Sequence, residues 1–148
     1  MDMNSKVVSH RQIPLGPAKD GGGCHGAMWH EGKLWIAALR LRGILRVDPT
    51  TWQPEFMIPF YQAPGRMRYH GTAWDNGAIW CLFAGDHLVQ KIDLDSGKVL
   101  EIVTLSRTSD PDPHGMCIHD GYMYYCDAGL TAPGPGSEPA QICRFKMV

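Results

Sequence analysis

The stretch HGAMWHEGKLW, residues 25–35, decides the fold because the chain contains two further versions of it. HGTAWDNGAIW occupies residues 70–80, and HGMCIHDGYMY occupies residues 114–124. All three share an opening His-Gly pair, an apolar residue at the fifth position, a glycine at the eighth, and an aliphatic-aromatic pair at the end. A phrase that recurs every 44 or 45 residues indicates a repeat architecture in which each copy builds one structural unit.

The similarity between the units extends beyond these eleven residues. Asp48 and Asp93 each follow the histidine of their unit by 23 residues. A basic residue recurs at one aligned position of every unit, as Arg46, Lys91 and Arg144. In the third unit, QICRFK (141–146) matches this stretch after a nine-residue insertion. The repeat therefore covers most of the chain.

Each unit divides into short strand-like runs. In the second unit, runs at 69–74, 78–84, 88–94 and 98–105 are separated by the turn signals DNG, GDH and DSG. No run of ten or more residues has a helical period. Four short antiparallel strands per unit of about 45 residues are typical of a β-propeller blade. We therefore expect an all-β fold with three four-stranded blades, with Trp35, Trp80 and Tyr124 in the inter-blade core.

The two ends of the chain bear on how the blades close into a ring. The third unit stops after its third strand, and SKVVSHRQIPL (5–15) aligns with GKVLEIVTL (97–105), the fourth strand of the second unit. Propellers hold about four to eight blades, so we expect a homodimer that forms a six-bladed ring. The amino-terminal strand of each copy would complete the last blade of the other. A nine-bladed trimer and a fragment of a longer propeller are the alternatives.

The expected domain organisation is a single half-propeller over residues 1–148. Residues 1–20 supply the outer strand that completes the last blade, and the blades follow at 21–64, 65–108 and 109–148. The third blade lacks its own outer strand.

Composition excludes several classes of partner. The chain has 14 basic and 15 acidic residues, a formal net charge of -1, so it lacks the positive surface that binds nucleic acid or an anionic membrane. No apolar stretch approaches the about 20 residues that span a bilayer, and MDMNSKVVSHRQ (1–12) has no signal-peptide core. We therefore expect a cytoplasmic protein whose five cysteines are reduced.

His25, His70 and His114 hold the same position in every unit, at the start of the innermost strand. In a propeller this position lies near the mouth of the central channel. Neutral imidazoles bind divalent ions such as Zn, Fe or Mn, and three of them with an open coordination position form a catalytic site. The pattern therefore predicts a divalent metal site. The alternative is that each histidine only fastens its blade to the next one.

Residues that differ between the units are candidates for the substrate site. Asp127 ends the second strand of the third unit, where the other units have Ala38 and Phe83. A carboxylate at a core-like position requires a partner or a function, and Asp127 is the candidate general base. Arg68 and Tyr69 are candidates for orienting an anionic or carbonyl substrate. Further loop residues expected at the same mouth are Cys24, Arg66, Asp110 and Asp112.

The unit HGxxWDxGxLW…KIDLDSGKVL resembles a broad group of β-propellers over almost the whole chain. The group includes virginiamycin B lyase-like, gluconolactonase-like, NHL and YncE-like proteins, and the plant-type glutaminyl cyclases. The resemblance implies a propeller, and several members are lyases, lactonases or other hydrolases with a divalent metal at one channel mouth. Others are binding scaffolds. This chain departs from the group in its half length and in lacking the Glu/Asn/Asp metal set of the gluconolactonase-like members.

The sequence thus predicts a small-molecule enzyme of lyase or hydrolase type that holds a divalent metal with histidines. The alternative is a non-catalytic propeller that binds a ligand or a protein and uses the histidines only to join its blades. A fold alone does not distinguish these two functions.

Overall fold

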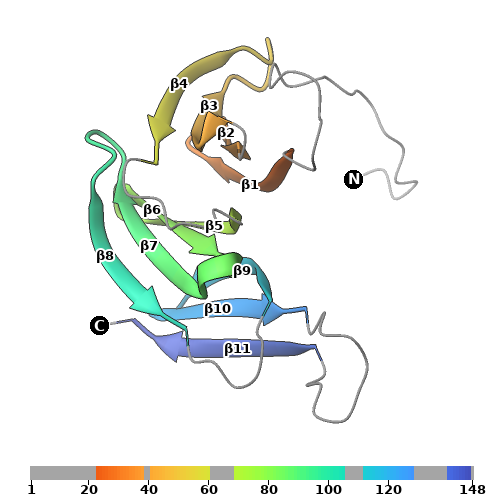
Figure 1. The fold of residues 1–148 in the computed structure, drawn as a ribbon. Coiled ribbons are helices and arrows are strands. Elements are labelled where there is room, and N and C mark those ends of the chain that lie inside the picture. Colours follow the sequence, from red (N-terminus) through yellow and green to blue (C-terminus); the bar gives the residue numbers. More distant parts are fainter. Residues whose placement is uncertain (1–22, 39–40, 61–68, 106–111, 129–139, 148) are drawn as a thin grey trace.

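Three antiparallel β-sheets make up the structure, a computed structural model that describes residues 23–38, 41–60, 69–105, 112–128 and 140–147 (Figure 1). Sheet 1 has the strand order β1-β2-β3-β4, sheet 2 has β5-β6-β7-β8, and sheet 3 has β11-β10-β9. Each strand pairs with the next one along the chain, as in a propeller blade. The predicted all-β, propeller-like fold is confirmed.

The strands are five to seven residues long. Sheet 1 contains β1 (Cys24–His30), β2 (Lys33–Ala38), β3 (Gly43–Val47) and β4 (Pro54–Pro59). Sheet 2 contains β5 (Tyr69–Asp75), β6 (Ala78–Phe83), β7 (Leu88–Asp93) and β8 (Val99–Thr104), with the short 3-10 helix η2 (Ala84–Asp86) between β6 and β7. Sheet 3 contains β9 (Pro113–His119), β10 (Tyr122–Asp127) and β11 (Gln141–Lys146). The four strands expected in the second unit are present as β5 to β8.

The glycine at the eighth position of the repeated phrase is required by the turn that follows each inner strand. The turn between β1 and β2 has positive φ at both Glu31 (48°) and Gly32 (73°). The equivalent pairs in the other two sheets are Asn76-Gly77 and Asp120-Gly121, also with positive φ at both residues. Two consecutive residues with positive φ match the twist of a tight hairpin, and glycine adopts this conformation without steric cost.

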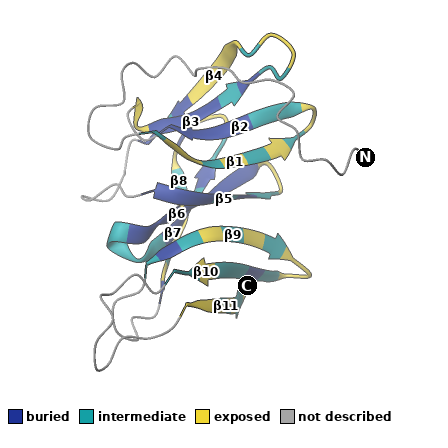
Figure 2. Cartoon of the chain, turned by 90° about the vertical axis from the view of Figure 1, so that its right-hand side faces the viewer, coloured by how far each residue is buried: buried dark blue, intermediate teal, exposed yellow. Residues whose placement is uncertain are grey.

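The first strands of the three sheets lie side by side. β5 contacts β1 on one side and β9 on the other, and both views show β5 between them (Figures 1 and 2). In Figure 2, β5 is mostly buried, whereas β1 and β9 each have exposed segments. Because the histidines of the repeated phrase lie on these strands, the stacking brings His25, His70 and His114 into one row.

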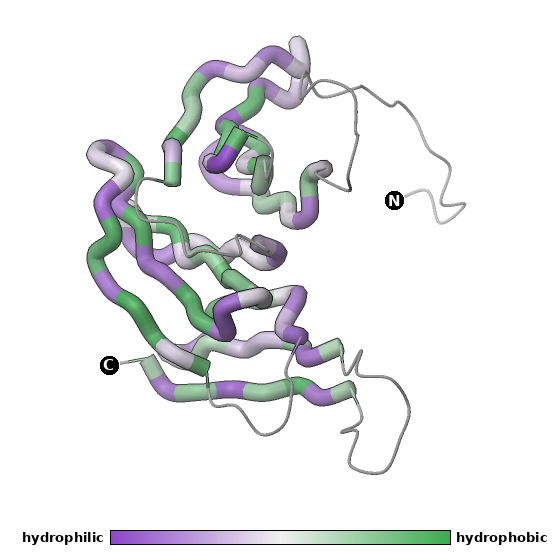
Figure 3. The backbone as a smooth tube through the Cα atoms, viewed as in Figure 1, coloured by the Kyte–Doolittle hydropathy of each residue, from purple (hydrophilic) through white to green (hydrophobic). Residues whose placement is uncertain are grey.

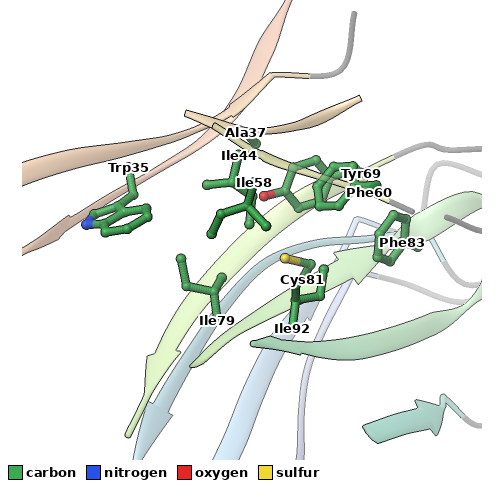
Figure 4. Close-up of a cluster of buried hydrophobic side chains, with 10 residues drawn as sticks. All are labelled: Trp35, Ala37, Ile44, Ile58, Phe60, Tyr69, Ile79, Cys81, Phe83 and Ile92. Atoms are coloured by element: carbon green, nitrogen blue, oxygen red, sulfur yellow. The ribbon is translucent and has the colours of Figure 1, made fainter. Parts of the chain in front are cut away.

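Two apolar clusters join the sheets. The cluster between sheets 1 and 2 contains Trp35 and Ile44 from one sheet and Tyr69, Ile79 and Phe83 from the other (Figure 4). The second cluster joins sheets 2 and 3 and consists of Trp80, Leu82, Ala84, Val89, Leu105 and Met123. A third, on the other face of sheet 1, consists of Ile36, Ala38, Leu45 and Val47. Burial of apolar area in these clusters stabilises the stack of sheets.

The predicted core positions are occupied unequally. Trp35 and Trp80 are buried between sheets, as expected. Tyr124, at the aligned position of β10, is only partly buried and lies on the face of sheet 3 that points away from sheet 2. On the same sheet, β11 alternates between hydrophobic and hydrophilic residues (Figure 3). Alternation of this kind is typical of a strand that packs on one face, and here Phe145 packs toward sheet 2.

Residues 1–20, predicted to supply an outer strand, lie outside the described residues. Sheet 3 accordingly has three strands within the described part of the chain, and ring closure stays a prediction. The 3-10 helix η2 is three residues long, and no helix in the described part of the chain is long and apolar enough to cross a membrane.

Candidate metal centre

The imidazoles of the three repeated histidines contact one another in sequence. The ring centroids of His25 and His70 are 4.8 Å apart in an edge-on arrangement, and their Nδ1 atoms are 3.1 Å apart. The ring centroids of His70 and His114 are 4.1 Å apart. The convergence expected from the repeat is therefore present, with His70 in the middle of the row.

The His-Gly pair sets this close spacing through the backbone. A Cβ atom on Gly26 would lie 2.3 Å from the carbonyl oxygen of His70, and one on Gly71 would lie 2.7 Å from that of His114. Real Cβ atoms do not approach an oxygen so closely, so only glycine lets neighbouring inner strands come this near. The glycines, rather than the imidazoles, determine how far apart the histidines lie.

A pocket of about 290 Å³ opens along the row. Its lining consists of His25, Gly26, Ala27, His70, Gly71, Thr72, His114, Gly115 and Met116. Its volume is at the lower end of the roughly 300–1,000 Å³ that small-molecule sites occupy. His70 is buried, while His25 is exposed, so the pocket passes from a buried centre to an open end.

Asp112 adds a carboxylate to the row. Its Oδ2 atom lies 3.2 Å from Nε2 of His114, and its side chain is 14% exposed. This Nε2 atom is buried and has no aligned hydrogen bond within the described residues. Two ligands of one ion lie at about this distance from each other without a hydrogen bond between them. The arrangement therefore fits a metal site.

One ligand atom from each of His70, Asp112 and His114 lies within 4.8 Å of the other two. Two ligand atoms about 2.1 Å from a tetrahedral ion are about 3.4 Å apart. The separation between Asp112 and His114 already matches this spacing, and binding would draw the three atoms together. Two imidazoles and one carboxylate suit Zn, Fe or Mn.

His25 has a different place in this arrangement from that of the other two histidines. It was predicted as a metal ligand, but its Nδ1 contacts Nδ1 of His70 instead of joining the group that contains Asp112. One of the two Nδ1 atoms must carry the proton, because two lone pairs would repel at 3.1 Å. Metal-binding histidines are commonly held by such a hydrogen bond from the ring nitrogen that does not bind the ion.

Asp127, the candidate general base, holds the backbone at the site. Its Oδ1 atom accepts a hydrogen bond of 3.1 Å from the backbone N–H of Asp112. Asp127 lies opposite Pro113 on the neighbouring strand, which places it beside the segment that carries Asp112 and His114. The Asp127 carboxylate thus has a hydrogen-bond partner, the backbone N–H of Asp112, as expected for a carboxylate at a core-like position.

Of the two residues expected to orient a substrate, Tyr69 lies in the core. Its ring stacks on Phe83 and contacts Phe60 edge-on, and the side chain is fully buried. Burial raises the pKa of Tyr69 well above its ordinary value, with a smaller contribution from the neighbouring Cys81 thiol. Tyr69 is not among the residues that line the pocket beside the histidines. Arg68 lies outside the described residues.

Asp112 is the site residue to which the sequence had assigned no specific role. It appeared only among several loop residues near the channel mouth. The available signal was its position two residues before the histidine of a repeated unit. The aligned positions of the other units carry Gly23 and Arg68, so the carboxylate is specific to the third unit.

Comparison with known proteins supports the fold alone. No protein-family model matches the chain, and no curated protein matches it. The structure resembles Myxococcus xanthus glutaminyl cyclase with a TM-score of 0.54 and 14% identity, covering 70% of this chain and 50% of that one. It resembles Kuenenia stuttgartiensis hydrazine synthase with a TM-score of 0.53 and 14% identity, covering 78% and 32%.

A third similar structure is the computationally designed Ika4 protein, with a TM-score of 0.52 and 10% identity, covering 84% of this chain and 66% of that one. The chain thus spans about half the length of the glutaminyl cyclase and a third of that of the hydrazine synthase. At these identities, the likeness concerns the arrangement of strands and not the activity.

Proposed function

We propose that this protein is a small-molecule enzyme of lyase or hydrolase type that uses one divalent metal ion. His70, Asp112 and His114 hold the ion at the inner strands, and the adjoining pocket admits the substrate. The buried Nε2 atom of His114, 3.2 Å from the Asp112 carboxylate and without an aligned hydrogen bond in the described residues, is the observation that carries this proposal.

A bound divalent ion supplies Lewis acidity that polarises a carbonyl oxygen of the substrate. The chain contributes positioning. Coordination of the ion through Nε2 of His70 requires the proton on its Nδ1 atom, which then donates to Nδ1 of His25 across 3.1 Å. Asp127 holds the backbone N–H of Asp112 and so fixes the carboxylate toward His114. These two contacts limit the orientations of the His70 and Asp112 side chains before the ion binds.

The reaction class rests on the resemblance of the repeat to lyase and hydrolase propellers. One structural neighbour is a glutaminyl cyclase, which is itself an enzyme, but the likeness extends only to the fold. The size of the pocket favours a small substrate over a polymer.

Metal analysis of the purified chain tests the proposal. We expect one Zn²⁺ or Mn²⁺ per chain after loading and gel filtration, and loss of the ion in Asp112→Asn and His114→Gln. Asp120→Asn is a matched control, because that carboxylate is 83% exposed on a turn. His87→Asn is the imidazole control, since Asn tolerates its left-handed backbone. Wild-type chain that retains no ion, or a control that loses it equally, would contradict a metal site here.

The second candidate is a non-catalytic propeller whose histidines only join the inner strands. The contact between the Nδ1 atoms of His25 and His70 favours it. Under this alternative, a His25→Gln, His70→Gln, His114→Gln chain should lose thermal stability whether or not metal is present. Under the metal proposal, the same variant should melt as the metal-free wild-type chain does.

A further inference from the structure

Trp29 is exposed although its counterparts in the other two units are packed. Trp74 has the same place in the repeated phrase, packs against the core of sheets 1 and 2, and stacks on His30 with ring centroids 3.4 Å apart. Ile118 packs against the cluster between sheets 2 and 3. Trp29 is 62% exposed. Ile36, Ala38, Leu45 and Val47 on the same face of sheet 1 are already buried within the chain. Trp29 is thus an inter-sheet anchor that stays exposed, with no further sheet to receive it among the described residues.

The opposite end of the stack presents the matching surface. Ile142 on β11 is 79% exposed, whereas Ile44 and Val89 at the aligned positions are fully buried between sheets. Cys126 is exposed where Ala37 and Leu82 are fully buried. Together with Gly115, Cys117, His119 and Tyr124, these two residues form what we call the outer face of sheet 3. This face has the positions of an inter-sheet contact but no neighbour among the described residues.

Gly115 shows which strand would complete the contact on the outer face of sheet 3. In the two contacts within the chain, the carbonyl of the histidine on the next inner strand lies where a Cβ of Gly26 or Gly71 would be. Within the described part of the chain, apart from its own sequence neighbours, no atom lies within 4 Å of the position that a Cβ on Gly115 would occupy. The carbonyl of His70 lies against Gly26, and the carbonyl of His114 lies against Gly71. The histidine of the repeated phrase whose carbonyl makes no such contact is His25 on β1. The space beside Gly115 therefore fits the carbonyl of His25 on a β1 strand.

The β1 strand of the same chain cannot fill this place, because β5 lies between β1 and β9. We propose that the outer face of sheet 3 binds β1 of a second copy of this chain. In that contact the carbonyl of His25 from the second copy lies on Gly115. Its Trp29 stacks on His119, which is the aligned counterpart of His30 and whose side chain is 74% exposed.

In a pair of copies, β1 of each copy binds the outer face of sheet 3 of the other. The two equivalent contacts close the three described sheets of each copy into a two-fold symmetric ring of six sheets. This number lies within the range of about four to eight sheets in propellers. His25 of the second copy follows His114 in the row of imidazoles. The pocket beside Gly115 is therefore completed by the other subunit. The contact between the two copies depends on packing alone, so it does not require a metal ion at the site.

Light scattering after gel filtration of the full chain measures the oligomer directly. We expect twice the chain mass of 16.5 kDa for wild type and the single mass for Trp29→Ser and for Ile142→Glu. Leu100→Ser is the matched control, because Leu100 is 58% exposed on the rim strand β8. It should leave the dimer intact. A wild-type chain of single mass at all concentrations would overturn the proposal, as would loss of the dimer in the control.

Mixing the two variants tests the head-to-tail arrangement. Trp29→Ser retains an intact outer face of sheet 3, and Ile142→Glu retains an intact β1. An equimolar mixture should therefore recover a dimer through one intact contact, whereas a dimer built from two like surfaces would not recover. Gly115→Ala adds a variant that leaves the isolated chain unstrained and should abolish the dimer. A stable dimer of Gly115→Ala would overturn the inference.

Discussion

The carbonyl oxygen of His70 lies 2.3 Å from the position that a Cβ atom on Gly26 would occupy. This contact holds β1 against β5 and repeats between Gly71 and His114 one strand further on. The glycine that follows each histidine therefore sets the separation of the inner strands. The imidazoles take their spacing from it.

We expect Gly26→Ala to lower the free energy of unfolding by about 1–3 kcal/mol, because the added methyl group forces β1 and β5 apart. Gly71→Ala should cost a similar amount, since its Cβ would meet both the His114 carbonyl and Met116. Gly23→Ala is the control, because no atom of the described residues other than its sequence neighbours lies within 4 Å of that Cβ position. Urea unfolding measures all three, and equal stability of the Gly26 and Gly23 variants would contradict the close contact.

Asp127→Ala should weaken metal affinity by about 10–100-fold, the usual effect of removing a group that orients a ligand. The variant loses the acceptor that holds the backbone N–H of Asp112. Asp127→Asn keeps an oxygen acceptor, so its affinity should stay near that of wild type. Titration calorimetry with Zn²⁺ compares the two variants. An equal loss in both would show that the charge of Asp127, and not its hydrogen bond, matters.

Acid should destabilise sheet 2 through Asp75. Burial opposes ionisation of this carboxyl, but hydrogen bonds from Lys91 at 2.6 Å and Trp80 at 3.0 Å outweigh it and hold the pKa of Asp75 below its ordinary value. A pKa lower in the folded chain means that the stabilisation is fully present above the unfolded pKa of 3.8 and is lost as pH falls through the folded value.

Asp75→Asn should therefore cost about 1.5–3 kcal/mol at pH 6, the range typical of hydrogen bonds to a charged group. The variant should also lose less stability than wild type between pH 6 and pH 3. The exposed Asp120→Asn should keep the wild-type dependence. Urea unfolding at the two pH values gives the comparison. If Asp75→Asn lost as much free energy of unfolding between pH 6 and pH 3 as wild type does, the acid sensitivity would belong to other carboxyl groups.

Tyr69→Phe should leave stability unchanged or raise it by up to about 1 kcal/mol, because it removes a buried hydroxyl without an aligned partner. That hydroxyl has no aligned hydrogen bond in the described part of the chain, and its neighbour is the weakly polar thiol of Cys81. Metal binding should also be unaffected. A loss of metal or of activity in this variant, with the fold intact, would return Tyr69 to the site.

Much of the fold was predictable because it depends on local chemistry. The turn at Asn76-Gly77 follows from residues that accept positive φ, and the burial of Trp80 follows from its place on a short apolar strand. Repetition strengthened both inferences, since the same turn and strand occur three times. Such features can be inferred from the adjacent residues in the sequence and from the aligned position in another unit.

The site was predictable only in part. That His70 and His114 meet follows from the repeat, because equivalent residues of stacked units lie side by side. Tyr69 was expected at the channel mouth but lies in the core, because a residue adjacent to a site histidine points to the other face of its strand. The role of Asp112 could not be read from the repeat, since its position differs in every unit.

The sequence by itself determined the strands, their turns, the repeat and the row of histidines, because these follow from local conformational preference and from the equivalence of units. Only the tertiary structure decided which atoms meet. It placed Asp112 at His114, turned His25 toward His70, and gave Asp127 a backbone partner. It also showed Trp29 and Ile142 exposed at opposite ends of the stack. Such contacts depend on distances between sheets, which spacing along a chain does not contain.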